Sequence, residues 1–414
     1  MEYLEIEGGN PLGGEVRIQG SKNAALPILS AALLNSGITV LHNCPKIIDV
    51  YYMLEILKGF GCQVIWERDT LIIDASCIYS SQVPKQYARQ MRSSIMLLGS
   101  LLGRMGNAFV PYPGGCVIGE RPIDIHLLAL RRMGAELEEE EEGLWAVCKH
   151  PKGGEICLPF PSVGATENVI LLAVLTEGIT VLKNAAREPE IEELCRFLSS
   201  MGANIQGAGT SRILIQGVSC LHDCEFTLVS DRIVAGTYML MTAAAGGKVL
   251  LEHAPVGQME SVYRILSCMG VKIKWEEGRI WLSGSGRING IRSVQTAPYP
   301  GFPTDLQSPL MAALSVADGE SQIEETIFEA RFKIVEELRR MGANIRIDGK
   351  KACICGVQKL CGRDLTAREL RGGAALVLAA AAAEGKSRIF ACHYIDRGYE
   401  NIIRDLQSLG VVVH

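Results

Sequence analysis

Hydrophobic and polar positions along this chain switch between two periods, and the same order of periods recurs. Long apolar stretches with helical spacing cover residues 24–37 and 374–385, and a glycine closes each of them, as expected at a helix C-terminus. Short alternating segments lie at residues 38–43, 179–184, 247–253 and 387–393, and this alternation predicts strands. The pattern therefore predicts an α/β protein.

One short phrase reveals an internal repeat. A second amphipathic helix repeatedly ends in Met-Gly or a close variant, and its glycines are Gly61, Gly134, Gly202, Gly270, Gly342 and Gly410. Successive glycines are 68 to 73 residues apart, which is too regular for chance and predicts six copies of one unit. We expect each glycine to adopt the left-handed conformation that ends a helix.

Each copy ends in a β-hairpin, so the unit is βαβαββ when it is followed in circular order. Residues 271–284 are an example, with two alternating segments joined by a Glu-Gly turn. Six units of about 70 residues exceed what one hydrophobic core holds, so two domains of three units are expected. No linker rich in Pro, Gly or Ser separates them, which favours short crossings and a cleft between similar halves.

Composition narrows the class of protein. Charged residues make up 21% of the chain and hydrophobic residues 48%, as in ordinary globular proteins. The formal net charge of −5 argues against a nucleic-acid binder, although a local basic site for a small anion remains compatible with it. No apolar run reaches the length of a membrane span, and the N-terminal sequence MEYLEIEGG lacks a signal-peptide core, so a cytoplasmic protein without membrane insertion is expected.

The 14 cysteines are scattered along a long chain, which favours reduced thiols over a disulfide framework. We expect most of them to pack as small apolar residues. Cys353 and Cys355 form one close pair, and Cys220 and Cys224 form another. Neither pair has a second pair at the spacing of a zinc site, so no metal site is predicted.

Cations lie at several predicted helix starts, where the positive end of the helix dipole disfavours them. Lys22, Arg92 and Arg371 occupy such positions, which makes sense if they surround an anion. Ser162 and Asp305 also lie at helix starts, where they could simply be N-caps. The Glu138–Glu142 run is expected to be a solvated face. Together these residues predict a two-domain enzyme that closes on a multiply anionic ligand.

A lone cysteine in a loop is the most distinctive candidate for chemistry. Cys116 follows two glycines within PYPGGCVIGERPIDIH, residues 111–126. Arg121 follows five residues later. A thiol beside arginines has a lowered pKa and becomes a nucleophile. From the residues alone, a buried structural cysteine is an equally good interpretation.

These motifs resemble one known family. GSKNAALP, MRSSI, PGGCVIGERPIDIH, PSVGATEN, NAAREPEI, SDRIVAGT, GFPTDLQ and IDRGYE, in this order along the whole chain, resemble the UDP-N-acetylglucosamine enolpyruvyl transferase family. The resemblance implies a two-domain inverse α/β barrel with three repeats per domain. One domain would span residues 22–229, the other residues 1–21 plus 230–414, and the active site would lie in the interdomain cleft.

The resemblance also implies an activity. Enolpyruvate would move from phosphoenolpyruvate to the 3-hydroxyl of UDP-N-acetylglucosamine, with release of phosphate, as the first committed step of bacterial peptidoglycan synthesis. Cys116 would donate the proton, could carry a covalent phosphoenolpyruvate adduct, and would be alkylated by the epoxide fosfomycin. Asp305 would take the proton of the sugar hydroxyl. No metal or redox cofactor is implied, and the expected partners are these two small substrates.

The remaining roles are carried over position by position, and Lys22 and Arg397 join Cys116 and Asp305 as implied catalytic residues. Phosphoenolpyruvate would be bound by Lys22, Asn23, Arg121, Arg331, Arg371 and Arg397. The nucleotide sugar would contact Asn23, Arg92, Arg121, Pro122, Ile123, Asp124, Ile125, Ser162, Val163, Gly164, Asp305 and Ile327.

Five positions depart from the family pattern. Glu369 replaces the usual aspartate and Ala330 the usual asparagine, Tyr299 and Tyr394 stand where histidine is common, and Phe160 stands where some members have lysine. These departures concern the surroundings of the cations and the finer nucleotide contacts. They keep two alternatives open, an enolpyruvyl transferase with a shikimate-type acceptor and a paralogue that binds nucleotide sugar without turnover. The sequence gives neither the oligomeric state nor which paralogue this chain would be.

Overall fold

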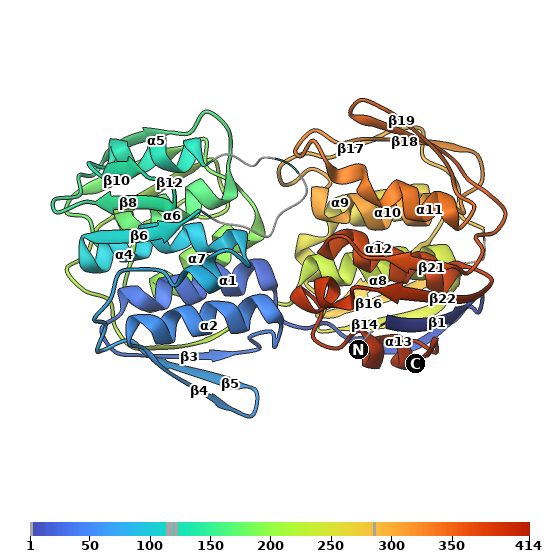
Figure 1. Ribbon diagram of the computed structural model, residues 1–414, viewed down its shortest axis with the longest axis horizontal. Coiled ribbons are helices and arrows are strands. Elements are labelled where there is room, and N and C mark those ends of the chain that lie inside the picture. The colour runs from blue at the N-terminus through green and yellow to red at the C-terminus, as the bar shows by residue number, and fades with distance from the viewer. Residues whose placement is uncertain (1–2, 113–118, 120–122, 285–286) are drawn as a thin grey trace. The chain divides into compact units, whose positions relative to one another are not determined.

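The computed structural model describes residues 3–112, 119, 123–284 and 287–414. The chain separates into two compact units (Figure 1). Unit 1 holds residues 1–19 and 230–414, and unit 2 holds residues 20–229 when the loop around residues 113–122 is set aside. The chain passes between the units after Gln19 and again after Val229.

Each unit contains three separate sheets in the part of the chain that is described, and each sheet includes one parallel pairing among antiparallel neighbours. In unit 2 the strand orders are β13(Cys224–Thr227)-β3(Ile38–His42)-β5(Thr70–Asp74)-β4(Gln63–Glu67), β11(Asn204–Gln206)-β12(Arg212–Gln216)-β10(Ile179–Lys183)-β9(Gly154–Cys157) and β6(Asn107–Pro111)-β8(Gly143–Val147)-β7(Glu136–Glu139). In unit 1 they are β21(Asp364–Thr366)-β22(Gly385–Phe390)-β1(Tyr3–Gly8)-β23(Val412–Val413), β15(Lys272–Glu276)-β16(Arg279–Gly284)-β14(Gly247–Glu252)-β2(Leu12–Arg17) and β17(Val294–Gln295)-β18(Glu320–Glu324)-β20(Lys351–Cys355)-β19(Asn344–Asp348).

The helices follow the same division. Unit 2 contains α1(Lys22–Ala31), α2(Ile48–Phe60), α3(Lys85–Ala88), α4(Leu97–Met105), α5(Asp124–Arg132), α6(Val163–Ala173) and α7(Pro189–Ser200). Unit 1 contains α8(Arg232–Ala245), α9(Glu260–Cys268), α10(Gln307–Leu314), α11(Val335–Arg340), α12(Leu370–Ala382) and α13(Ile402–Ser408). Short 3₁₀ turns precede or follow several of them and carry site residues: η2(Arg92–Met96), η4(Thr304–Leu306), η5(Arg331–Ile334) and η6(Cys392–Arg397).

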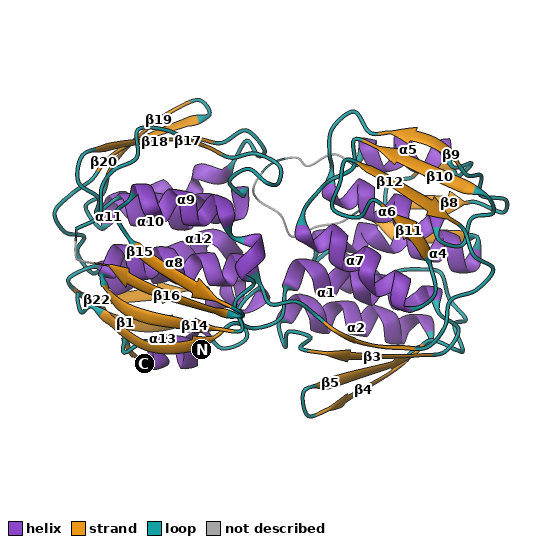
Figure 2. Cartoon of the chain, turned by 180° about the vertical axis from the view of Figure 1, so that it is seen from behind, coloured by secondary structure: helices purple, strands orange, loops and turns teal. Residues whose placement is uncertain are grey.

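Within each unit, helices form the interior and sheets the outside (Figure 2). In unit 1, α8, α10 and α12 pack on one another and are apolar on all sides, as fully surrounded helices must be. Their few polar side chains bond to the preceding turn: Thr237 and Thr242 in α8 donate to the carbonyls of Ile233 and Tyr238, each at 2.8 Å. The inner helices therefore bury no unsatisfied hydroxyl at these two positions.

The repeat prediction is confirmed in detail. The six phrase glycines have φ between 79° and 112°, the left-handed conformation expected after a helix. The predicted strands are present as β3, β10, β14 and β22, and the hairpin at residues 271–284 is β15 and β16. The helix predicted over 24–37 ends earlier: α1 stops at Ala31 and a 3₁₀ turn continues to Leu34.

Cysteine packing was predicted wrongly. Of the 13 described cysteines only Cys44, Cys62, Cys148 and Cys195 are buried, and all 13 are free thiols. Many of the others lie in strands or loops whose second face meets solvent. Burial raises the pKa of Cys62 and Cys195 to about 12, so these two thiols stay protonated and unreactive.

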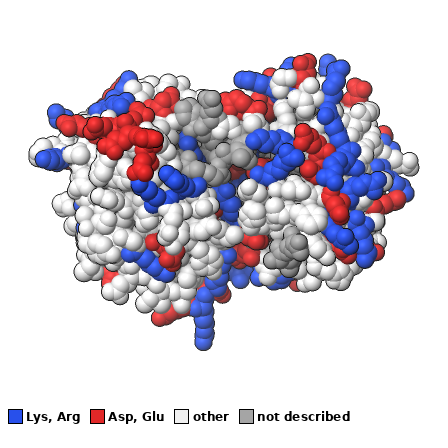
Figure 3. All heavy atoms as spheres, viewed as in Figure 1, with Lys and Arg blue, Asp and Glu red and all other residues white. Residues whose placement is uncertain are grey.

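On the face that Figure 3 presents, acidic side chains gather at the upper left, and basic and acidic side chains of unit 1 lie side by side at the right. All residues of the acidic run Glu138–Glu142 are exposed, as predicted. Among the described residues, no helix combines the length and apolarity needed to cross a bilayer.

A repeated glycine gives a stability prediction for unit 1. A Cβ added to Gly356 would lie 1.9 Å from the carbonyl oxygen of Ala317, and the equivalent Gly217 of unit 2 would lie 1.7 Å from that of Thr176. Because the obstacle is backbone, Gly356→Ala should lower the free energy of unfolding by about 1–3 kcal/mol. Denaturant unfolding measures this. Gly257→Ala is the control, because nothing lies within 4 Å of its Cβ, and equal behaviour of the two variants would contradict the prediction.

Candidate active site

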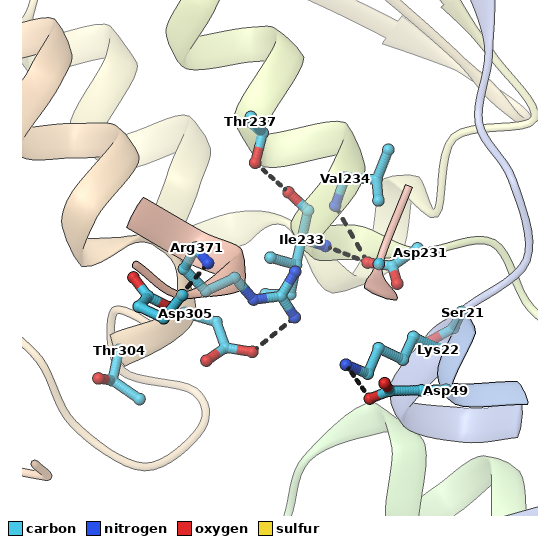
Figure 4. A network of polar contacts seen from close by, with 12 residues as sticks. Ser21, Lys22, Asp49, Asp231, Ile233, Val234, Thr237, Thr304, Asp305 and Arg371 are labelled. Carbon is cyan, nitrogen blue, oxygen red and sulfur yellow. Dashed lines mark hydrogen bonds and ion pairs between the residues drawn. The ribbon is translucent and has the colours of Figure 1, made fainter. Parts of the chain in front are cut away.

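Asp305 is the centre of a charged cluster in unit 1. It lies in η4, and its Oδ1 accepts from Arg331 Nη2 at 2.5 Å. Its Oδ2 accepts from Arg371 Nη2 at 2.7 Å (Figure 4). The side chains of Arg331 and Arg371 are 3% and 5% exposed, whereas that of Asp305 is 25% exposed. The carboxylate therefore reaches solvent while both of its cationic partners are buried. Asp305 is not the N-cap that its position also allowed.

Arg371 keeps part of its binding capacity unused. Its buried Nη1 has no hydrogen-bond partner among the residues that the structure describes. Burial by itself would lower the pKa of Arg371, but Asp305, Tyr399 and Asp231 together raise it, so the guanidinium stays charged. A buried cation with an unbonded N–H costs free energy unless an acceptor fills the position. This position suits an oxygen of an anionic ligand.

Glu369 orders both arginines. It is the N-cap of α12, where its carboxylate accepts from the backbone N–H of Arg371 at 2.8 Å and from that of Gly372. The same carboxylate lies 3.6 Å from Arg331 Nη1. Although Glu369 departs from the family pattern, it caps the helix and pairs with Arg331. Both arginines of the cluster are therefore held by Glu369 as well as by Asp305.

The backbone at Ile327 is held by a buried acid. Glu325 Oε1 accepts from the N–H groups of Ile327 and Phe328, at 2.8 and 3.1 Å, and its Oε2 accepts from the hydroxyl of Thr304 at 2.9 Å. Thr304 in turn accepts from Arg331 Nε at 3.2 Å. Glu325 thus joins the segment of Ile327 to the turn that carries Asp305. Sequence reasoning missed both Glu325 and Thr304.

The other predicted positions of unit 1 lie in η6, before η4 and before η5. Arg397 ends η6, and the ring of Tyr394 in the same turn lies 4.3 Å from that of His393. The guanidinium of Arg232 lies 5.8 Å above the ring of Tyr299, a cation–π contact that histidine in its neutral form would make less well. Ala330 directly precedes η5.

Lys22 occupies the corresponding helix start in unit 2. Ser21 caps α1, and Lys22, its first residue, pairs with Asp49 on α2 at 2.7 Å (Figure 4). The Asp49 side chain is 3% exposed. The sequence predicted an anion beside Lys22. In the structure, the Asp49 carboxylate is at least part of that negative charge. Asn23 follows Lys22 and is half-buried.

Three further predicted segments of unit 2 meet at one amide. Asn168 in α6 is fully buried; it donates to the carbonyl of Ile95 in η2 at 3.1 Å and to His126 Nδ1 in α5 at 2.8 Å, and it accepts from the N–H of Gly99 at 2.7 Å. It thereby joins η2, which begins at Arg92, to the start of α5 and to α6. Sequence reasoning missed Asn168, although a polar residue inside an apolar helix was the available signal.

The starts of α5 and α6 are close-packed. A Cβ on Gly164 would lie 2.8 Å from His126 Cε1, so a larger residue there would require the His126 ring to shift. Ser162 is the N-cap of α6, with its hydroxyl accepting from Ala165 N at 3.4 Å, which confirms the capping interpretation for this serine. Val163 begins α6, Asp124 begins α5, and Ile123 and Ile125 flank Asp124, all at least partly accessible.

Three predicted site residues lie outside the described part of the chain, namely Cys116, Arg121 and Pro122. Phe160 is 44% exposed on the approach to α6.

A buried acid under α6 gives a pH prediction. Glu167 is 1% exposed, and neither of its oxygens has a hydrogen-bond partner within the described part of the chain. Burial, with added repulsion from Glu190 and Glu188, raises its pKa well above the ordinary 4.5. The folded protein thus holds a proton that the unfolded chain releases, so its stability falls as pH rises above about 4.5 towards the folded pKa.

Glu167→Gln removes this pH dependence, because the amide resembles the protonated acid. Its stability relative to the wild type should increase between pH 4.5 and pH 8, by on the order of 1–3 kcal/mol. Urea unfolding at several pH values measures the difference, with the exposed Glu177→Gln as the control. A difference that stays constant with pH would show that Glu167 is ionised in the folded state.

The chain has relatives along its whole length. Residues 6–406 match the profile described as EPSP synthase (3-phosphoshikimate 1-carboxyvinyltransferase). UDP-N-acetylglucosamine 1-carboxyvinyltransferase 2 of Caldanaerobacter subterraneus subsp. tengcongensis is 46% identical over 99% of this chain and 98% of its own length. The enzymes named UDP-N-acetylglucosamine 1-carboxyvinyltransferase of Nitratidesulfovibrio vulgaris and Methylacidiphilum infernorum are 44% and 45% identical over 99% of this chain and 98% of theirs. The chain belongs to the UDP-N-acetylglucosamine 1-carboxyvinyltransferase family.

Solved structures support the same fold. The enolpyruvyl transferase NikO from Streptomyces tendae superposes with a TM-score of 0.89 at 24% identity, covering 100% of this chain and 98% of that one. EPSP synthase from Acinetobacter baumannii superposes with a TM-score of 0.75 at 17% identity, covering both chains fully. The predicted inverse α/β architecture, with helices inside and sheets outside, is that of the 1-carboxyvinyltransferases, a family of transferases.

Proposed function

We propose that this chain transfers the enolpyruvyl group of phosphoenolpyruvate to the 3-hydroxyl of UDP-N-acetylglucosamine and releases phosphate, as the first committed step of peptidoglycan synthesis in the bacterial cytoplasm. Its relatives at 44–46% identity carry the name of this activity over nearly their whole length. The observation that carries the proposal on the structural side is the unbonded, buried Nη1 of Arg371 beside the Asp305 carboxylate. Arg371 would bind an oxygen of the anionic substrate there, and Asp305 would accept a proton beside it.

The chemistry assigns opposite tasks to an acid and a base. Protonation of the methylene carbon of phosphoenolpyruvate leaves an oxocarbenium-like centre at the neighbouring carbon, and the sugar hydroxyl adds there. We assign the acid to Cys116 and the base to Asp305, since a carboxylate that reaches solvent can accept the hydroxyl proton. Loss of a methyl proton and of phosphate from the tetrahedral intermediate then restores the double bond.

Cations supply the electrostatic part of catalysis. Arg331 and Arg371 in unit 1 are fixed by Asp305 and Glu369 before substrate arrives, and Lys22 in unit 2 is fixed by Asp49. Fixed cations stabilise the charge of phosphate and carboxylate without reorganisation. We include Arg121 and Arg397 in this group and Asn23 beside it. No cofactor enters this scheme, because only C–H, O–H and C–O bonds are exchanged.

Acceptor binding is assigned to unit 2 together with two positions of unit 1. The starts of η2, α5 and α6 would present Arg92, Asp124 and Ser162–Gly164 to the nucleotide sugar, with Ile123, Ile125 and Pro122 beside them. Backbone N–H groups at helix starts suit a diphosphate. Ile327 and Asp305 would contact the sugar from unit 1.

The test of the proposal is phosphate release from phosphoenolpyruvate by the purified full chain, with UDP-N-acetylglucosamine, with shikimate 3-phosphate, or with no acceptor. Release that requires UDP-N-acetylglucosamine supports the proposal. Release with shikimate 3-phosphate instead would make the chain a shikimate-type transferase. Binding of the nucleotide sugar, seen as a raised unfolding temperature, without release in any mixture would make it a non-catalytic binder.

Cys116→Asp should keep part of this activity and lose inactivation by fosfomycin. An aspartic acid still donates a proton, but it is alkylated by an epoxide far more slowly than a thiolate. The measurement is residual phosphate release after incubation of both proteins with fosfomycin. Inactivation of the variant at the wild-type rate would place the alkylated group elsewhere and remove Cys116 from its assigned role.

A further inference from the structure

One buried amide lies where the chain first leaves unit 1. Gln19 follows β2 and is the last residue of unit 1 before the crossing. It is 7% exposed. Its Nε2 donates to the carbonyl of Gly398 at 3.1 Å, and its Oε1 accepts from the N–H of Glu400 at 2.8 Å. The side chain therefore pairs with backbone on both sides of Tyr399, as a neighbouring strand would.

This pairing connects the crossing to the segment that follows Arg397. The Gly398 and Tyr399 N–H groups bond back to the carbonyl of Ile395, so they complete the turn that ends at Arg397. Two further polar groups of this backbone bond to the Gln19 side chain, namely the Gly398 carbonyl and the Glu400 N–H. Without the amide, the backbone that follows Arg397 would lose both of these hydrogen bonds, which fix the direction of the chain there.

The same residue also pairs with the second crossing. The carbonyl of Gln19 accepts from the N–H of Asp231 at 2.8 Å. Asp231 is the N-cap of α8, with its carboxylate accepting from Ile233 and Val234 at 2.8 and 3.0 Å (Figure 4). Gln19 thus holds the second crossing with its backbone and the Arg397 segment with its side chain.

The packing of this segment shows why the amide is needed. A Cβ on Gly398 would lie 2.8 Å from Leu370, the residue before Arg371, and the hydroxyl of the buried Tyr399 donates to Thr237 in α8 at 2.8 Å. These contacts fix the side chains of the segment against α12 and α8, whereas the Gln19 bonds fix its backbone. Gln19 supplies the donor and the acceptor together, which glutamate, with no donor when ionised, does not.

We propose that Gln19 is a positioning residue that couples the chain crossings to Arg397, so that the amide sets how Arg397 meets the anionic substrate. This inference rests on the proposed function for its kinetic consequence but not for its structural one. Gln19 itself is assigned no contact with substrate.

The structural arm of the test needs no activity. Hydrogen exchange, followed by mass spectrometry, is measured for the peptide covering residues 395–401 in the wild type, Gln19→Ala, Gln19→Glu and Gln358→Glu. Gln358 is exposed and lies in unit 1, so its variant controls for the added charge. We expect exchange at Glu400 to speed up by about tenfold in both Gln19 variants and not in the control. Unchanged exchange in both Gln19 variants would overturn the proposal.

The kinetic arm separates positioning from general damage. In Gln19→Glu the KM for phosphoenolpyruvate should rise about tenfold, whereas the KM for UDP-N-acetylglucosamine should stay within about twofold. In an Arg397→Lys background, Gln19→Glu should raise the KM for phosphoenolpyruvate by less than about half as much. The effects of two residues that act through one another are not additive. Equal effects on both substrates, or full additivity with Arg397→Lys, would overturn the coupling.

The two arms distinguish the two proposals. If the wild type releases no phosphate, the proposed function fails, and the exchange experiment still decides the role of Gln19. If the wild type is active and Gln19→Glu behaves like the wild type in both arms, the function stands and the inference about Gln19 is wrong. Thermal unfolding of each variant identifies one that has lost its fold, and Gln19→Ala, which introduces no buried charge, then serves in place of Gln19→Glu.

Discussion

Asp305→Ala is expected to reduce turnover by about 10²–10⁴-fold, the range that loss of a general base produces, while UDP-N-acetylglucosamine still binds. Phosphate release measures turnover, and calorimetry measures binding of the nucleotide sugar. The expectation follows from the position of the carboxylate, which is reachable from solvent while its two partners are buried. Asp305→Ala removes the two carboxylate oxygens that could accept the proton, and it changes no other side chain of the cluster.

The loss of Asp305 has a second consequence, which must be separated from the first. Arg331 and Arg371 would then be buried without the carboxylate that pairs with both. Uncompensated buried charge destabilises the fold, although Glu369 still lies near Arg331. Asp305→Asn separates the effects, because the amide oxygen still accepts a hydrogen bond but does not take up a proton.

If Asp305 is the base, the alanine and asparagine variants should both be slow. Both should also lose stability, the alanine variant more, because asparagine keeps one acceptor oxygen and alanine keeps none. Near-normal turnover in Asp305→Asn would remove the residue from the proton transfer. Glu324→Gln is the control for changing an acid in unit 1, since Glu324 lies on β18 outside the cluster.

The regular part of this protein could be predicted because it depends on local chemistry. A helix that ends at Gly202 or Gly270 requires a left-handed residue there, and the sequence shows a glycine at each repeat. Strand alternation is equally local, so β10 and β14 were located to within a residue. The shortened α1 was missed because the pattern of apolar residues does not distinguish an α-helical turn from a 3₁₀ turn.

The candidate site could be predicted only in its residue types. Lys22 stood out as a cation at a helix start, yet its partner Asp49 lies on another helix, and no periodicity connects the two. Ser162 and Asp305 looked alike, and the structure makes one a cap and the other the centre of an arginine cluster. That difference depends on which long side chains fold over the turn, which is a tertiary property.

The positioning residues were missed for a related reason. Asn168 and Gln19 act by satisfying backbone groups of segments distant in sequence, and Glu325 joins its own segment to the distant Thr304. A polar side chain that takes up another segment's N–H or carbonyl has no signature of its own beyond being polar where burial is expected. Such residues become visible only when the hydrogen bonds of each buried segment are accounted for.

Arg371→Met is expected to lower kcat/KM for phosphoenolpyruvate by about 10²–10³-fold, the cost of losing one preorganised donor to developing charge. The variant removes the unbonded Nη1 and leaves a side chain of similar length. Stability should fall by only about 1–3 kcal/mol, because Asp305 is part-exposed and keeps Arg331. Kinetics with each substrate varied in turn and urea unfolding measure the two effects.

Arg371→Lys decides what the second nitrogen is for. An ammonium can pair with Asp305, but it does not offer a planar fork to a second acceptor. If the free Nη1 binds an oxygen of the substrate, lysine should restore stability and leave most of the defect in kcat/KM. If the guanidinium only holds Asp305, lysine should restore both. Arg264→Met is the control, because the side chain of Arg264 is 73% exposed and pairs with Glu260. This variant should leave kcat/KM unchanged and change the free energy of unfolding by no more than about 0.5 kcal/mol. A loss as large as that of Arg371→Met would mean that the Arg371 result reflects no specific site.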